Sequence, residues 1–299
     1  MNEQRPFGER LTDAFEAFGH LCVGIDPHPY LLEKWGLADS PAGVREFGLR
    51  VVDAAGGRAG IVKPQVAFYE RHGSAGFAAL ERVLGAARAS GLVVIADVKR
   101  GDLGTSVAAY GEAWLTRGSS LEADAITVSA YQGLGSLDEP WRLALESGKG
   151  LFVLAATSNP ESYETQTAIV AKGIHSGLTV AASIVDGVIR SNAVATPPVL
   201  GSSDGLASAS RLGSLGVVIG ATVDLADFGI VPSTLSSTPI LAPGFGHQGA
   251  QVTDIPQLYG AAAGSVLVSS SRGILEAGPD GIVAAITSEV RGLAEVYAV

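Results

Sequence analysis

Two charged residues of opposite sign end one apolar run of the sequence. Residues 92–96 are all apolar, and Asp97 and Lys99 follow, separated by Val98. Residues two apart on a β-strand share a face, so both charges should project the same way from an apolar floor. An unpaired charge in such a place is costly, which favours a chemical role over the plain alternative of a solvated pair at a strand end.

Further charges end other apolar runs. Asp26 and Lys63 each do so, and Asp102 comes three residues after Lys99. Alternating charges would keep both lysines protonated, because a neighbouring carboxylate favours the ammonium form, whereas burial alone lowers a lysine pKa. The array therefore favours a lysine that donates a proton, and a Schiff-base role for Lys99 is the weaker hypothesis.

A glycine-rich segment and an arginine nearer the C-terminus indicate an anion site. Residues 244–249 match the dinucleotide-binding pattern GxGxxG, but the acidic residue required about 20 positions later is missing, and Arg272 stands in that region. An arginine suits a phosphate. We expect Gly246, Gln248 and Arg272 to bind a phosphate, with glycine-rich turns that bind nothing as the alternative.

Eight short apolar runs, alternating with alanine-rich stretches of helical length, would position these residues. The predicted strands cover residues 21–26, 60–65, 92–99, 123–129, 151–157, 215–221, 239–244 and 265–271. Near-continuous apolar strands that alternate with helices indicate a parallel sheet buried on both faces. Eight units favour an α/β fold of the closed (β/α)8 TIM-barrel type over an open sheet, and barrels build their active sites at the carboxyl ends of the strands.

One barrel domain should occupy residues 1–299, because α/β barrels routinely use about 250 residues for a single domain. The spacing of the strands is regular except for a long insertion-like segment at residues 158–214. A helix-like stretch opens this segment. Its second part, residues 191–214, is rich in Ser, Gly and Pro and is predicted to be a surface loop.

The composition argues against several classes of function. A net charge of -10 disfavours nucleic acid as a partner, and the only cysteine, Cys22, excludes an intrachain disulfide. No apolar run reaches the roughly 18 residues that span a membrane, and no secretion signal is evident, so we expect a cytoplasmic protein without a membrane partner. The absence of HExxH motifs and Cys/His clusters predicts no metal, and there is no GxSxG nucleophile elbow.

Taken together, these motifs resemble those of the orotidine 5′-monophosphate decarboxylases, in particular a longer bacterial subgroup with the motif Asp-x-Lys-Arg-Gly-Asp, found here at residues 97–102. The resemblance also covers residues 23–27, 62–65, 157–160, 243–249 and 271–273. It departs at residues 125–133, where the subgroup more usually shows Thr-Val-Asn-Pro-Tyr-Met-Gly. The contacts of the fourth strand are therefore left open.

The resemblance implies decarboxylation of orotidine 5′-monophosphate (OMP) to UMP and carbon dioxide, the last step of de novo pyrimidine nucleotide synthesis, without a cofactor. Lys99 would protonate C6 as carbon dioxide leaves, and Asp97 would face the substrate carboxylate. Lys63 and Asp26 would hold the charged array and the ribose hydroxyls. The remaining contacts implied are Ser158 at the pyrimidine and Gln248 and Arg272 at the phosphate, and Asn159 is a further expected substrate-binding residue.

The resemblance also implies a homodimer. Asp102, the second aspartate of the motif, would serve the site of the neighbouring subunit, with Ser106 nearby on the same segment.

Rival classes make different demands on the sequence. Hexulose-phosphate synthases and ketogulonate-phosphate decarboxylases share an Asp-x-Lys-x-x-Asp strand but use magnesium, and they place a glutamate where this chain has Lys63. A non-catalytic nucleotide-binding protein on the same fold would be expected to lose one of the charges. A Rossmann-type oxidoreductase would bind a nicotinamide cofactor.

Overall fold

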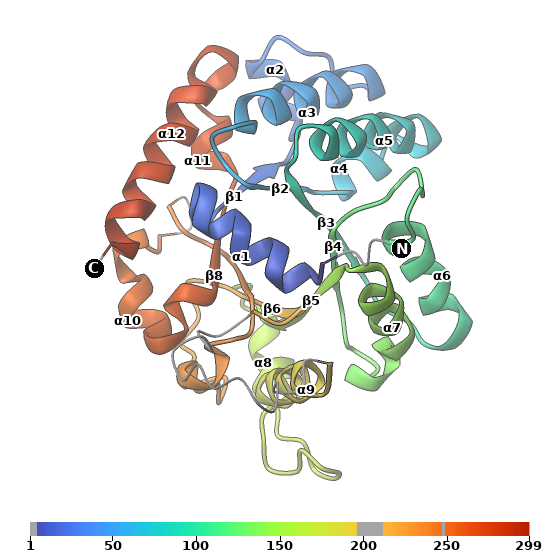
Figure 1. Ribbon diagram of the computed structural model, residues 1–299, viewed down its shortest axis with the longest axis vertical. Helices are drawn as coiled ribbons and strands as arrows, with labels where there is room; N and C mark the ends of the chain where they lie inside the picture. The colour runs from blue at the N-terminus through green and yellow to red at the C-terminus, as the bar shows by residue number, and fades with distance from the viewer. Residues whose placement is uncertain (1–4, 196–211, 247–248, 299) are drawn as a thin grey trace.

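Eight parallel strands close into a barrel in the computed structural model, which describes residues 5–195, 212–246 and 249–298 (Figure 1). Each strand pairs with its neighbours in sequence, and the eighth pairs back with the first. The strands are β1 (Leu21–Ile25), β2 (Ile61–Pro64), β3 (Val93–Arg100), β4 (Ala125–Val128), β5 (Gly150–Ala156), β6 (Leu215–Ile219), β7 (Ile240–Pro243) and β8 (Val266–Ser270). The predicted (β/α)8 barrel is confirmed, and strand boundaries differ from the prediction by two residues or fewer.

Helices surround the barrel (Figure 1). The α-helices are α1 (Phe7–Phe18), α2 (Pro29–Lys34), α3 (Pro41–Ala55), α4 (Ala67–Glu70), α5 (Gly73–Ala89), α6 (Gly104–Leu115), α7 (Asp138–Ser147), α8 (Ser162–Gln166), α9 (Val180–Ala195), α10 (Ile255–Tyr259), α11 (Arg272–Leu275) and α12 (Gly278–Tyr297). Local signals set their ends. At the start of α3, for example, the Ser40 hydroxyl accepts a hydrogen bond from the backbone N–H of Gly43, and Pro41 occupies the first turn.

The core has two parts. A large apolar cluster joins the strands to the outer helices, and a smaller cluster fills the barrel itself. The inner cluster contains Phe7, Leu11 and Phe15 of α1 together with inward-facing strand residues such as Ile61 and Phe152. Helix α1 therefore lies across the amino ends of the strands and closes that end of the barrel (Figure 1).

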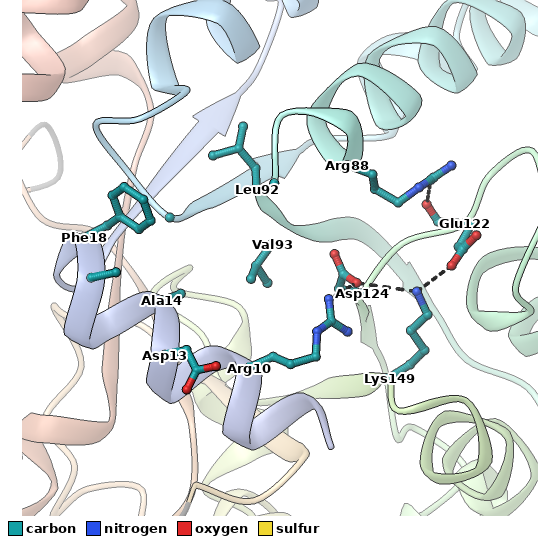
Figure 2. A pocket seen from close by; sticks show the side chains of 13 residues that line it. Arg10, Asp13, Ala14, Phe18, Arg88, Leu92, Val93, Glu122, Asp124 and Lys149 are labelled. Carbon is teal, nitrogen blue, oxygen red and sulfur yellow. Dashed lines mark hydrogen bonds and ion pairs between the residues drawn. The ribbon is translucent and has the colours of Figure 1, made fainter. Parts of the chain in front are cut away.

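A network of buried charges holds α1 in this place. Lys149, which is 1% exposed, lies with Nζ 2.8 Å from Glu122 Oε1 and 3.5 Å from Asp124 Oδ1. The Asp124 carboxylate also accepts hydrogen bonds from Arg10 of α1 and, at 2.9 Å, from the backbone N–H of Val94. Figure 2 shows this network around a cavity of about 500 Å³. The cavity lies at the amino ends of the strands, the face that barrel enzymes use for stability rather than chemistry.

Asp124→Ala is expected to lower the free energy of unfolding by about 3–5 kcal/mol, because it leaves the buried Lys149 and the Arg10 guanidinium without their shared carboxylate. Urea denaturation measures the change. Asp53→Ala, at an exposed position of α3, serves as the control and should change stability by less than about 0.5 kcal/mol. Equal stability of the two variants would contradict the role assigned to the network.

The segment between β5 and β6 corrects part of the prediction. It contains α8, an antiparallel bridge between Ile169 and Thr179, and α9. Helix α9 continues to Ala195, and Gly213 and Ser214 are buried, so the surface loop predicted for residues 191–214 was wrong at both described ends. A tertiary contact explains the longer helix. The Asn192 side-chain amide donates a hydrogen bond of 2.7 Å to the carbonyl of Leu215, at the start of β6, and accepts one of 3.1 Å from its backbone N–H. Residues 196–211 lie outside the described residues.

No helix in the described part of the chain is both long enough and apolar enough to cross a membrane.

Candidate active site

A cavity of about 480 Å³ opens at the carboxyl ends of the strands. Lys63 and Asp97 form the floor of this cavity. Both point into the barrel because each comes two residues after an inward-facing isoleucine, Ile61 or Ile95. Along the barrel axis, the inward-facing side chains thus change from an apolar layer to a polar layer at the carboxyl ends of the strands. The polar residues that line the cavity are Asp26, Lys63, Gln65, Asp97, Lys99, Thr127, Thr157, Ser158, Asn159, Gln166, Ser269, Ser270, Ser271 and Arg272.

The Asp97 carboxylate is the centre of a charged array. Its Oδ1 lies 2.6 Å from Lys99 Nζ, and its Oδ2 lies 3.2 Å from Lys63 Nζ. The Thr127 hydroxyl donates to Oδ1 at 2.7 Å, and the Gln65 side-chain amide donates to Oδ2 at 2.9 Å. Four donors occupy the acceptor sites that an ionised carboxylate offers, so the site is built for the charged form of Asp97.

The surroundings of this array shift two pKa values. Burial opposes the charge on Asp97, but the ammonium groups of Lys63 and Lys99 outweigh it and hold the pKa of Asp97 below its usual range. Burial likewise favours the neutral amine of Lys63, yet the carboxylates of Asp97 and Asp26 raise its pKa. Lys63 therefore stays an ammonium in neutral solution, as the alternating charges in the sequence led us to expect.

Strand β3 carries a bulge where Lys99 leaves it. Pairing with β4 is regular up to Ala96 and resumes at Arg100, so three residues of β3 lie opposite one residue of β4, Thr127. Lys99 has φ 47° and is the only non-glycine residue with positive φ in the described part of the chain. Such a conformation costs about 1–3 kcal/mol and is concentrated at functional sites, where bulges redirect side chains.

At the ends of β1 and β8, the cavity carries groups that could bind an anion and a hydroxyl. Ser271 donates a hydrogen bond of 2.6 Å to Asp26 Oδ2, whereas Asp26 Oδ1 is buried without a hydrogen-bond partner among the described residues. Arg272 lines the same wall. Within the described residues its guanidinium makes no hydrogen bond or ion pair, so it keeps its donors for a ligand.

The loop after β5 forms a third wall and is fixed by one glutamine. Gln166 accepts a hydrogen bond from the backbone N–H of Thr157 at 2.8 Å and donates to its hydroxyl at 2.9 Å. The Thr157 hydroxyl in turn donates to Asn159 Oδ1 at 2.8 Å. At the end of β6, a Cβ at Gly220 would come within 3.2 Å of Ser158 Cβ, so glycine permits a close approach of this loop.

The structure brings most of the predicted site residues to this cavity, namely Asp26, Lys63, Asp97, Lys99, Ser158, Asn159 and Arg272. Asp102, Ser106 and Gly246 are not among the described residues that line it. The Asp102 carboxylate instead accepts a hydrogen bond of 2.9 Å from the backbone N–H of Leu103. Gly246 lies exposed in a turn with φ 72°. Gln248 lies outside the described residues.

Seven polar residues of the cavity had no predicted role: Gln65, Thr127, Thr157, Gln166, Ser269, Ser270 and Ser271. Gln65 shares a strand face with the lysine two positions earlier, and Thr127 is the one polar residue within an apolar strand, so both left a signal in the sequence. Ser271 directly precedes the predicted phosphate arginine. Gln166 gave no signal in the sequence, because it lies on α8, away from any strand end, and reaches the cavity only when α8 packs beside the loop after β5.

The donor set of the cavity does not suit a metal ion. No group of three or more His, Cys, Asp or Glu side chains among the described residues is arranged to hold one. The Lys63 ammonium, 3.2 Å from Asp97 Oδ2, would repel a cation at that carboxylate.

The barrel and its cavity of alternating charges define a (β/α)8-barrel enzyme. Residues 19–285 match the model of the orotidine 5′-phosphate decarboxylase / HUMPS family. The chain belongs to this family, as the resemblance of the motifs indicated.

Curated relatives named orotidine 5′-phosphate decarboxylase agree with this assignment. One from Nocardioides sp. is 48% identical over 270 residues, which are 90% of this chain and 92% of the relative. Another, from Streptomyces coelicolor, is 46% identical over 278 residues, or 92% and 91% of the two chains.

Two solved structures are also similar. A Streptomyces avermitilis protein has a TM-score of 0.86 and 44% identity, with 99% of this chain and 96% of that chain covered. The Leishmania donovani OMP decarboxylase has a TM-score of 0.74 and 26% identity, with 98% and 99% covered.

Proposed function

We propose that this protein decarboxylates OMP to UMP and carbon dioxide by cofactor-free electrostatic catalysis, with Lys99 as the proton donor. The observation that carries the proposal is the Asp97 carboxylate between two lysines, 2.6 Å from Lys99 and 3.2 Å from Lys63, in a cavity that Arg272 also lines. The curated relatives, which are named orotidine 5′-phosphate decarboxylases, support the same substrate.

The chemistry needs a fixed cation at C6. When the bond between C6 and the carboxylate breaks, its electron pair stays on C6, where no adjacent carbonyl delocalises it. The Lys99 ammonium, already oriented by its 2.6 Å contact with Asp97, stabilises this charge with little reorganisation of its surroundings. Its proton then passes to C6 and forms the C–H bond of UMP, and the lysine regains a proton from water. Repulsion between Asp97 and the substrate carboxylate, relieved as carbon dioxide leaves, is a secondary contribution.

The other cavity walls would hold the rest of the nucleotide. Asp26, with one free carboxylate oxygen, suits the ribose hydroxyls beside Lys63. Ser158 and Asn159 suit the polar edge of the pyrimidine. Arg272 suits the phosphate, for which the sequence also indicates Gly246 and Gln248.

Lys63 argues against the magnesium-dependent branch of the family. A metal enzyme would need an acidic ligand where Lys63 stands, and the buried ammonium instead neutralises the Asp97 carboxylate directly.

A homodimer would complete the site. Asp102 follows the bulge directly but does not line the cavity of its own chain, so we propose that it enters the site of a second copy, with Ser106 beside it. Large apolar side chains lie exposed on the same and the next βα unit: Leu103 is 60% exposed and Tyr131 is 89% exposed. Exposed apolar surface of this kind is typical of a protein interface.

Arg272→Ala is expected to lower kcat/KM for OMP about 10- to 100-fold, because one charge-assisted contact to the phosphate is lost. Both a higher KM and a lower kcat should contribute, since binding energy remote from C6 also orients the reacting ring. Steady-state kinetics measure both constants. Arg291→Ala, at an exposed position of α12, is the matched control; an Arg272 variant that kept the wild-type KM would refute the phosphate role.

An activity assay tests the proposed function. Purified protein is incubated with OMP, and loss of the orotate chromophore is followed together with formation of UMP. A parallel reaction offers a hexulose phosphate with magnesium. We expect turnover of OMP alone, and consumption of the sugar phosphate without turnover of OMP would place the protein in the other branch of its family.

A further inference from the structure

The Thr127 hydroxyl connects the two charged residues at the centre of the cavity. Thr127 lies on β4 and is 1% exposed. Its hydroxyl oxygen accepts a hydrogen bond of 3.0 Å from the backbone N–H of Lys99, and its proton is donated to Asp97 Oδ1 at 2.7 Å. A hydroxyl can donate and accept at once, which no apolar side chain of the same size can do.

The bulge of β3 explains why this hydroxyl is needed. Thr127 is the single residue of β4 that lies opposite residues 97–99, the bulged part of β3. Regular pairing is interrupted there, so no backbone carbonyl of β4 is in place to accept a hydrogen bond from the Lys99 N–H. A buried N–H without a partner is unfavourable, and Lys99 already holds a costly φ of 47°. The Thr127 side chain takes the place of the missing ladder bond. Because threonine is β-branched, few rotamers are open to it and the hydroxyl is held in direction.

A second group braces the bulge from its outer side. The Arg100 guanidinium donates to the carbonyl of Val98 at 3.1 Å and to Glu70 at 2.6 Å, so the peptide before Lys99 is held as well. The two sides differ in what they touch. Arg100 touches backbone and a surface carboxylate, whereas Thr127 touches the catalytic carboxylate itself.

We propose that Thr127 is a positioning residue that sets the direction of the Lys99 ammonium and keeps the Asp97 carboxylate in place during the reaction. The proposal rests on the decarboxylase function argued above. As Lys99 Nζ turns from Asp97 Oδ1 towards C6, that oxygen loses one of its two donors, and the Thr127 hydroxyl remains as the other. Without Thr127, only Oδ2 of Asp97 would still be held, by Lys63 and Gln65, so Oδ1 could follow the lysine and hold the proton back from C6.

Thr127→Val and Thr127→Ser test the proposal, because valine keeps the size of threonine and serine keeps its hydroxyl. For Thr127→Val we expect kcat to fall about 10- to 100-fold with KM for OMP within about threefold of wild type, since a misplaced catalytic group affects turnover more than binding. Thr127→Ser should recover kcat to within about threefold of wild type. The matched control is Thr238→Val, another buried threonine, placed just before β7 at the opposite end of the barrel.

The result that would overturn the proposal is a Thr127→Val enzyme with wild-type kcat, or a Thr127→Ser enzyme as impaired as the valine variant. If Thr127→Val does not fold, Thr127→Cys replaces it, since a thiol is a weak donor, and a kcat equal to that of Thr127→Ser would count against the proposal.

Crystal structures of wild type and Thr127→Val give a readout that does not depend on turnover. We expect Lys99 in the valine variant to leave the left-handed region, so that its Nζ no longer lies where it does in the wild type. An unchanged Lys99 geometry would overturn the proposal even if OMP is the substrate, whereas a wild-type enzyme that does not convert OMP would overturn the proposed function and leave this structural comparison valid.

Discussion

Lys99→Ala is expected to lower kcat for OMP by about 10⁴-fold or more. Two effects act together at this side chain: a preorganised charge that stabilises the developing carbanion, worth about 10²–10³, and a positioned general acid, worth about 10²–10⁴. The Lys99 ammonium lies 2.6 Å from Asp97 and is not needed to hold the phosphate or the ribose, so the affinity for UMP should change much less than kcat.

Two comparisons sharpen this prediction. Lys99→Arg keeps a positive charge but cannot release a proton, so its kcat should also collapse if proton donation is the essential step. Lys172→Ala removes an exposed lysine and should retain wild-type turnover. Stopped-flow or long-time assays of UMP formation give the rates, and a Lys99→Ala enzyme within tenfold of wild type would remove Lys99 as the proton donor.

Asp102→Asn is expected to lower kcat about 10²-fold or more, and mixing it with Lys99→Ala should restore activity. If Asp102 enters the neighbouring site, a hybrid dimer carries one site with Lys99 from one chain and Asp102 from the other, both intact. Random exchange of subunits makes about half of the dimers hybrid, so about a quarter of all sites should be functional. Neither single variant can reach that level.

A second mixture is the control for subunit sharing. Asp97 and Lys99 lie 2.6 Å apart in the cavity of one chain, so a hybrid of Asp97→Asn with Lys99→Ala contains no intact site and should stay inactive. Recovery in both mixtures, or in neither, would contradict the assignment of Asp102 to the partner site. Sedimentation of the mixtures at assay concentration verifies that dimers are present.

The fold could be predicted because its signals are short-range. Each buried strand is a run of mainly apolar residues, most of the strands have a charged or polar residue at or just after the carboxyl end, and the barrel places all these ends on one face. The same logic brought Asp26, Lys63, Asp97 and Lys99 together from four positions in the chain. The alternation of side chains along a strand, with a period of two residues, was sufficient to predict that these four charges meet.

The bulge could not be predicted from this alternation. A regular strand through Lys99 would also place it on the same face as Asp97, so the sequence offers no sign that the backbone turns to φ 47°. The bulge depends on the register between β3 and β4 and on the Thr127 hydroxyl, both of which are long-range properties. Gln166 escaped prediction for the same reason, since its hydrogen bonds to Thr157 exist only once α8 packs under the loop.

The end of α9 gives a further example of tertiary structure overriding a local signal. Residues 191–195 precede a proline-rich stretch and read as a loop, but Asn192 binds the backbone of Leu215 and keeps the last turn helical. Propensity is a weak guide where one side chain makes two hydrogen bonds to a strand.

The most direct test of the whole account is to decarboxylate OMP in D₂O with enzyme treated with EDTA and to analyse the UMP by proton NMR. We predict one UMP for each carbon dioxide released, with a single deuterium at C6 and none at C5, at a rate that magnesium does not increase. UMP without deuterium at C6 would contradict protonation of C6 by an exchangeable acid. Loss of turnover after EDTA treatment that magnesium restores would contradict the cofactor-free mechanism.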